Sequence, residues 1–100
     1  MGSRALAKPG RISWSEEKNE KLKRERDISF EDVVYAMASG AILDTFDHPN
    51  QDRYREQKIH VVEIDGYAYL VPFIESAEGI FLKTIIPSRK ATKLYLERKT

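Results

Sequence analysis

Cysteine is absent from this sequence of 100 residues, so the chain can form neither a disulfide nor a thiolate metal site, and nothing points to an oxidising compartment. The two histidines, His48 and His60, lie far apart and not in a metal-ligand spacing, so we expect no metal site and no cofactor. No apolar run approaches the length of a membrane span, and residues 1–12 lack the apolar stretch of a signal peptide. These absences favour a cytoplasmic protein with no membrane partner.

Several devices of catalytic sites are also missing. The sequence contains no glycine-rich phosphate loop and no serine in a nucleophile elbow. Glu31, Asp32 and Glu63 form no evident carboxylate pair, so hydrolases that need these devices are disfavoured. Neither sign of charge is in large excess, since 17 basic residues stand against 16 acidic ones. A net charge of +1 predicts no affinity for nucleic acid by itself, so any such affinity depends on where the cations lie.

What is present suffices for one small domain, because 41% of the residues are hydrophobic. We interpret residues 1–11, which are small and basic around Pro9-Gly10, as a flexible N-terminal extension. Residues 12–98 then form a single domain. Its first part predicts a short strand at residues 12–14 and two helices.

The first predicted helix covers residues 16–26, is nearly all charged and begins after Ser13 or Ser15. The second begins after Ser29, with Asp32 placed for a capping box, and stops at Gly40. Its apolar stripe at helical spacing comprises Phe30, Val33, Val34, Met37 and Ala41.

Strand-like segments follow at residues 42–46, 58–64, 67–74 and 80–86, and Asp65-Gly66 is a strong hairpin signal between the second and third. Ser88 is expected to cap a helix from residue 89 to about 98, with Leu94 as its main apolar contact and Tyr95 beside it. The predicted fold class is α+β: an antiparallel meander of three to four strands with two N-terminal helices and a short C-terminal helix, and with the helices on one face.

A two-residue turn at Asp65-Gly66 would pair Ile64 with Tyr67 and place alternate residues on opposite faces. We expect one face to carry Ile59, Val61 and Leu70 and to share a core with Phe30, Val33, Val34, Met37 and Ile85. The other face would collect Lys58, His60, Tyr67, Tyr69 and Phe73, with Lys83 or Thr84 beside them. Aromatic rings between cations suit single-stranded RNA, although a partner, the first helix or a second copy could equally cover this face. Pro72 predicts an edge or a bulge.

The segment Lys83–Lys93 joins the last strand to the last helix and places Arg89 and Lys90 at the helix start. Cations are unfavourable there unless an anion such as phosphate lies nearby, but they are also common on solvated surfaces. Arg53 and Arg55, in the loop at residues 48–55, could clamp phosphate or only keep the loop solvated. His60 is either a general acid or base or a structural residue.

Three segments, Ile12–Asn19, Ile28–Val33 and Ile85–Thr92, resemble in order the BrnT toxins of bacterial type II toxin-antitoxin modules. The resemblance implies a RelE-like fold, a metal-independent ribonuclease that inhibits translation, and a co-encoded antitoxin with a ribbon-helix-helix part. In RelE-like chemistry the RNA 2′-hydroxyl attacks the adjacent phosphate, and cations stabilise the developing charge.

The implied catalytic residues are Arg89 and Lys90, assisted by Lys83, with His60 or a tyrosine as proton carrier. The implied RNA-binding residues are Lys58, Tyr67, Tyr69, Arg53 and Arg55. The chain departs from the family in carrying Phe81-Leu82-Lys83-Thr84 where arginines are usual, and Glu25-Arg26-Asp27 where a Lys-His-Gly-like segment is usual. A non-catalytic RNA- or antitoxin-binding module on the same fold is therefore the alternative, and the chain is expected to act as a homodimer or in a heterotetramer with the antitoxin.

Overall fold

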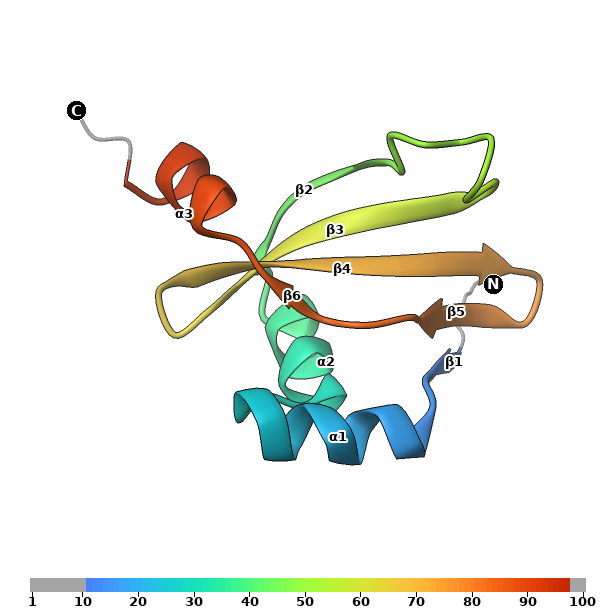
Figure 1. The fold of residues 1–100 in the computed structure, drawn as a ribbon, viewed down its shortest axis with the longest axis horizontal. Coiled ribbons are helices and arrows are strands. Elements are labelled where there is room, and N and C mark those ends of the chain that lie inside the picture. Colours follow the sequence, from blue (N-terminus) through green and yellow to red (C-terminus); the bar gives the residue numbers. More distant parts are fainter. Residues whose placement is uncertain (1–10, 98–100) are drawn as a thin grey trace, which may run out of the picture.

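The computed structural model describes residues 11–97 (Figure 1). Its elements are, in order, β1 (Arg11–Ser13), α1 (Glu16–Arg26), α2 (Phe30–Ala38), β2 (Ile42–Asp47), β3 (Gln57–Ile64), β4 (Tyr67–Ser76), β5 (Gly79–Leu82), β6 (Ile86–Pro87) and α3 (Arg89–Tyr95). The α+β class and the order of elements agree with the prediction. Arg11 belongs to β1, where the sequence placed it in the extension, and the rest of that extension and Arg98 lie outside the described residues.

The strands form one mixed sheet in the order β1-β5-β4-β3-β2, with β6 paired to β4. Strands β2 to β5 make the predicted antiparallel meander, and β1 adds a parallel pairing with β5. The hairpin turn is confirmed, since Ile64 pairs with Tyr67 and both turn residues have positive φ, 53° at Asp65 and 79° at Gly66. Glycine tolerates this geometry at no steric cost.

Local capping explains where the helices begin. Ser15 caps α1 by accepting from the Lys18 N–H, and Ser29 with Asp32 forms the capping box of α2. α1 carries acidic residues in its first turn and basic ones in its last, the signs that the helix dipole favours. None of the helices in residues 11–97 is long and apolar enough to cross a membrane.

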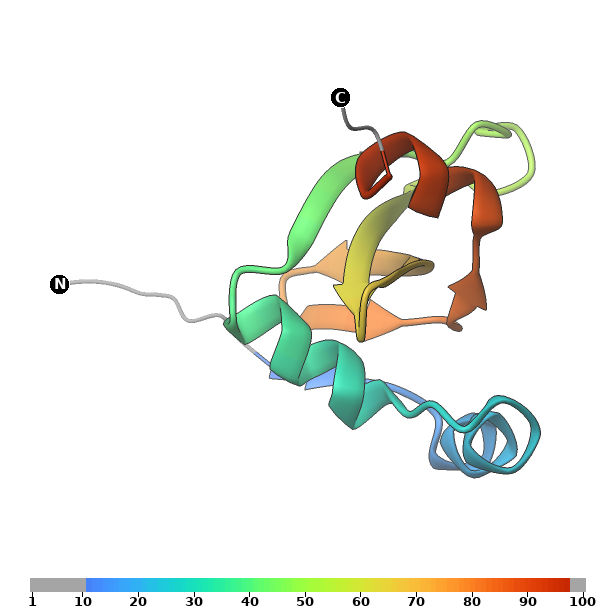
Figure 2. The ribbon, with the colours of Figure 1, turned by 90° about the vertical axis from the view of Figure 1, so that its left-hand side faces the viewer.

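The helices occupy both faces of the sheet, so the expectation that they share one face is wrong (Figure 2). α1 and α2 cover the face of Val62, Val71 and Phe73, and α3 lies across the other face. The main core is made of Leu22, Ile28, Phe30, Val33, Ala36, Val62, Val71, Phe73, Leu82 and Ile85. Residue pairing was predicted correctly, but the face that packs on the helices was inverted.

Val61 and Leu70 belong to a separate, smaller core with Ala68 and Ala91, under α3. The predicted single core containing Val61, Leu70 and the stripe of α2 is therefore wrong. Leu94 is not the main apolar contact of α3 either, because it is 60% exposed while Ala91 and Thr92 are buried. The helix ends at Tyr95, earlier than predicted.

The predicted strand at residues 80–86 is interrupted between β5 and β6, at Lys83–Ile85. The Lys83 N–H donates to the Pro72 carbonyl at 2.8 Å, so this edge of β4 faces the interruption. The N–H and C=O of a strand residue point toward the same neighbouring strand. The N–H that proline lacks would therefore also have pointed toward the break at Lys83–Ile85. Pro72 thus lies in a central strand with a regular register to β3, so the predicted edge or bulge at Pro72 is wrong; its donor-free side faces the break at Lys83–Ile85 instead.

Candidate functional site

α3 carries the junction cations, and the side chains of Thr92 and Tyr95 attach it to the sheet. Ser88 caps the helix by accepting from the Ala91 N–H at 3.0 Å. Thr92, only 5% exposed, accepts from the Ala68 N–H at 2.9 Å and donates to the Ser88 carbonyl at 2.8 Å. The Tyr95 hydroxyl donates to the Asp44 carboxylate of β2. The helix is thereby held across β2, β3 and β4.

A groove of about 300 Å³ lies between α3 and the sheet. Its lining is Phe46, Val61, Leu70, Ser88, Lys90, Ala91, Leu94 and Tyr95. Phe46 and Leu94 are 38% and 60% exposed, so large apolar side chains meet solvent at this place. We call this feature the α3 groove; the sequence pointed to Lys90 within it but not to Phe46, because only the pairing of β2 with β3 brings Phe46 to this face.

The exposed surface of α3 is basic, and Lys90 is the cation that lines the α3 groove. Arg89, Lys90 and Lys93 are all exposed, and α3 contains no acidic residue. Asp44 is the nearby carboxylate, and the hydrogen bond from Tyr95 lowers its pKa. The same hydrogen bond raises the pKa of Tyr95, which keeps its hydroxyl protonated.

His60 lies on the opposite face of the sheet from the α3 groove, since its neighbour Val61 is the residue that lines the groove. Its Nδ1 is 2.7 Å from the Thr45 hydroxyl, and its ring stacks on Phe73 with 4.2 Å between centroids. Burial lowers its pKa, and Glu75 opposes that change weakly. The structure does not bring His60 together with Arg89 and Lys90.

The sequence analysis expected an open sheet face of aromatic side chains that would bind RNA, but in the structure much of that face is covered by α1 and α2. Phe73 is only 3% exposed, and Tyr69 packs against the main core under α1 and α2. Tyr67 and Tyr69 contact each other edge to face, with centroids 5.6 Å apart. Lys58 is exposed near the start of β3, on this same face. A strand face can therefore be core at Val62 and surface at Lys58, because the helices cover only part of its length.

The remaining predicted cations lie elsewhere. Arg53 stacks over Tyr54 at 5.5 Å in the loop between β2 and β3, and Arg55 is exposed in the same loop. Lys83 lies in the break after β5, with its Nζ 5.9 Å from the centroid of the Phe81 ring. Of the predicted site residues, only Arg89 and Lys90 lie on α3, the helix that borders the α3 groove.

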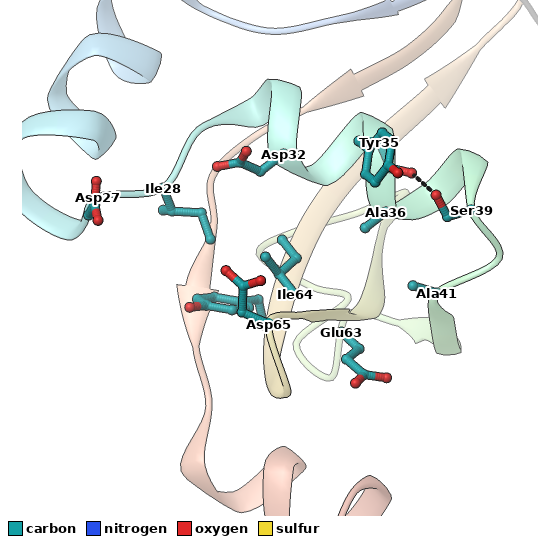
Figure 3. A pocket seen from close by; sticks show the side chains of 11 residues that line it. Asp27, Ile28, Asp32, Tyr35, Ala36, Ser39, Ala41, Glu63, Ile64 and Asp65 are labelled. Carbon is teal, nitrogen blue, oxygen red and sulfur yellow. Dashed lines mark hydrogen bonds between the residues drawn. The ribbon is translucent and has the colours of Figure 1, made fainter.

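A second cleft, of about 330 Å³, lies between α2 and the β3–β4 hairpin (Figure 3). It collects the carboxylates Asp27, Asp32, Glu63 and Asp65, and no lysine or arginine lines it. Asp32 is already engaged in the α2 capping box, and burial raises the pKa of Tyr69. The sequence analysis missed this cleft because its acids come from two distant stretches of the chain, residues 27–32 and 63–65, which only the fold brings together. Within residues 11–97, no cluster of three or more histidine and acidic side chains is placed to hold a metal ion.

The segments that resemble BrnT toxins contact one another. Trp14 stacks on Phe30 with 5.5 Å between centroids. Asn19, fully buried, accepts from the Phe30 N–H at 2.7 Å and donates to Glu31 at 2.8 Å. Arg26, which lies between the first two of these segments, donates to the Ile85 carbonyl of the third at 2.9 Å. These contacts hold the three segments together, and Arg89 and Lys90 are exposed cations of the third segment.

Comparison of the chain with protein-family models, with curated proteins and with solved structures finds no match.

Proposed function

We propose that this chain is a toxin of a BrnT-type, RelE-like toxin-antitoxin module, which binds RNA through the cations at the start of α3. The observation that carries this proposal is the position of Arg89 and Lys90, exposed on the sheet face that α1 and α2 leave open. The order of the elements, with two N-terminal helices, a meander and a short C-terminal helix, supports it further.

The proposed chemistry is metal-independent cleavage, in which the RNA 2′-hydroxyl attacks the adjacent phosphate. Arg89 and Lys90 bind the phosphate and stabilise the charge that develops on it. Such an enzyme inhibits translation in the cytoplasm, and a co-encoded ribbon-helix-helix antitoxin neutralises it. The chain then acts as a homodimer or in a heterotetramer with the antitoxin. Because His60 is on the other face, we do not retain it as proton carrier; nor do we retain Lys83, Lys58, Arg53 and Arg55 as parts of one site.

A non-catalytic binding module is the second candidate, and a specific observation favours it. Tyr95 is the tyrosine that lines the α3 groove, but its bond to Asp44 keeps it protonated, so it is poorly suited to accept a proton. On this alternative the chain binds RNA or an antitoxin through the same cations and cleaves nothing.

Binding and cleavage of a fluorescent single-stranded RNA by the purified chain test both candidates. The variant Arg89→Ala/Lys90→Ala removes the proposed phosphate contacts, and Lys21→Ala/Arg24→Ala removes the same charge from exposed positions on α1. We expect the first variant to bind RNA at least about tenfold more weakly than the second, with unchanged thermal stability in both. Equal binding by the two variants contradicts the proposal.

Cleavage by the wild-type chain, lost in Arg89→Ala/Lys90→Ala, supports the ribonuclease. Binding without cleavage under metal-free conditions supports the non-catalytic module. Expression of the intact chain in bacteria adds a second readout, since a translation inhibitor slows growth and the control variant should slow it equally.

A further inference from the structure

The loop between β2 and β3, residues 48–56, gathers three planar side chains. The rings of His48 and Tyr54 have centroids 4.2 Å apart and planes inclined by 31°. The Arg53 guanidinium lies over the Tyr54 ring, 5.5 Å from its centroid. Arg53 is exposed, whereas His48 and Tyr54 are half-buried, so the guanidinium is the member of this group most open to solvent. We call His48, Arg53 and Tyr54 the loop stack.

Hydrogen bonds within the loop hold the loop stack in place. The His48 N–H donates to the Gln57 carbonyl at 2.9 Å, and the Gln57 N–H donates to the Tyr54 carbonyl at 3.0 Å. The Tyr54 N–H donates to the Asn50 carbonyl at 2.9 Å. The Asn50 side chain accepts from the Arg53 N–H at 3.1 Å, and the Asn50 N–H donates to His48 Nδ1 at 3.0 Å. None of these bonds uses the Arg53 guanidinium, so its planar face stays free for a ligand.

A guanidinium plane that is ordered in advance suits a nucleobase. Unpaired bases of single-stranded RNA stack on aromatic rings and on arginine planes. The Tyr54 ring already restrains Arg53, so stacking a base on it costs less side-chain entropy than on a free arginine. A phosphate suits the loop less well, because Arg53 and Arg55 are balanced there by Asp52 and Glu56.

We propose that the loop stack is a base-binding subsite for single-stranded RNA, in which an unpaired base stacks on the Arg53 guanidinium. This deepens the proposed function, on which it rests, because Arg89 and Lys90 hold a phosphate of the same strand. Stacking tolerates any base but is stronger for larger ones, so we expect adenine to bind more tightly than uracil.

The loop stack and α3 lie where one RNA strand can contact both. Both are on the side of the sheet opposite α1 and α2 (Figure 1 and Figure 2). The hydrogen bond from Tyr95 to Asp44 fixes α3 beside β2, and His48 follows Asp44 by four positions. At a rise of about 3.3 Å per residue, the loop therefore begins about 13 Å from that contact. Single-strand sites of about 4 to 16 nucleotides cover such a span.

The test compares the same conservative change at two arginines of one loop. Arg53→Lys keeps the charge and removes the planar group, and Arg55→Lys is the matched control at an exposed position. Binding of fluorescent oligoadenylate and oligouridylate of about ten nucleotides is measured on the full chain. We expect Arg53→Lys to bind oligoadenylate about tenfold more weakly than Arg55→Lys does, and to lose the preference for adenine. Equal affinities of the two variants overturn the proposal.

A third variant, Arg53→Gln, separates stacking from charge. If Arg53 stacks on a base, Arg53→Gln binds as weakly as Arg53→Lys, and the dependence of affinity on salt stays as in the wild type. If Arg53 contacts a phosphate instead, Arg53→Lys binds like the wild type. Arg53→Gln then reduces the slope of log affinity against log salt by about 0.7 in magnitude. That second result overturns the base subsite.

The remaining outcomes separate this inference from the proposed function. Weak binding by Arg89→Ala/Lys90→Ala, with wild-type binding by Arg53→Lys, overturns the base subsite and supports the proposed function. The reverse pattern supports the base subsite and contradicts the proposed role of α3. A wild-type chain that binds neither oligonucleotide overturns both.

Discussion

Asn19 shows how one residue can join two helices. Its side chain lies in α1, is fully buried, and satisfies the first N–H of α2 through the bond to Phe30. Buried polar groups are tolerated when their hydrogen bonds are complete, and here the amide also donates to Glu31. That bond lowers the pKa of Glu31. The role of Asn19 is therefore to position α1 against α2.

Asn19→Ala should destabilise the domain by about 1–3 kcal/mol, because the Phe30 N–H is left buried without an acceptor. The free energy of unfolding in urea measures this change. Glu31→Gln is the control, since it keeps an amide partner for Asn19 at the exposed end of the network. A loss in the control as large as in Asn19→Ala would show that the Glu31 contact, not the Phe30 N–H, is the important one.

His60 is expected to make the folded protein less stable as the pH falls below neutrality. Burial lowers its pKa below the usual value of 6.5, so the unfolded chain binds a proton more readily than the folded chain. The contribution of His60 to stability is complete above pH 6.5 and is lost as the pH falls through the usual pKa toward the lowered one.

The prediction is that the free energy of unfolding decreases from about pH 8 to about pH 5, and decreases less in His60→Gln. Urea titrations of both proteins across this range give the comparison, and the difference between them removes the contribution of other titrating groups. Identical slopes would mean that His60 is as accessible to protons in the folded chain as in the unfolded one.

At the scale of elements, α3 is the most exposed part of the proposed site and the one whose attachment matters most. It is short, with only Ala91 and Thr92 buried. Short helices are not stable in isolation, so its structure depends on the sheet contacts of Thr92 and Tyr95. Its cations are positioned by those contacts.

Thr92→Val should loosen α3, because valine has the same shape but leaves the buried Ala68 N–H without an acceptor. We expect a loss of about 1–3 kcal/mol and faster hydrogen exchange of the α3 amides. Thr84→Val is the matched control, since Thr84 lies half-buried in the break between β5 and β6. If the α3 amides stay protected in Thr92→Val, the hydrogen bond of Tyr95 to Asp44 is sufficient to hold α3 on the sheet.

At the scale of the whole molecule, the sheet separates two cores of unequal size. The larger one lies under α1 and α2, and the smaller one lies under α3. Leu82 is completely buried in the larger core, whereas Leu94 is 60% exposed at the α3 groove. The face under α3 therefore has the smaller core and the more exposed leucine.

Leu82→Ala should cost about 2–5 kcal/mol through lost burial and a cavity, and Leu94→Ala should cost far less. The two variants delete the same atoms, so their unfolding free energies compare the two environments directly. A larger loss in Leu94→Ala would mean that α3, not α1 and α2, covers the principal core.

The sequence by itself determined the order of the elements, the helix starts and the β3–β4 turn, but not the break between β5 and β6 or the pairing of β1 with β5. Ser15, Ser29 and Ser88 begin the helices and Asp65-Gly66 makes the hairpin turn, because capping and turn formation depend on residues only a few positions apart. Alternation along β3 and β4 also predicted which residues share a face. It could not predict which face packs on α1 and α2, because Lys58 and Val62 share a face yet one is exposed and the other is buried. The tertiary structure alone decided this, since the helices cover only part of each strand. The same long-range packing places His60 away from Arg89, and brings Phe46 and Leu94 together in the α3 groove.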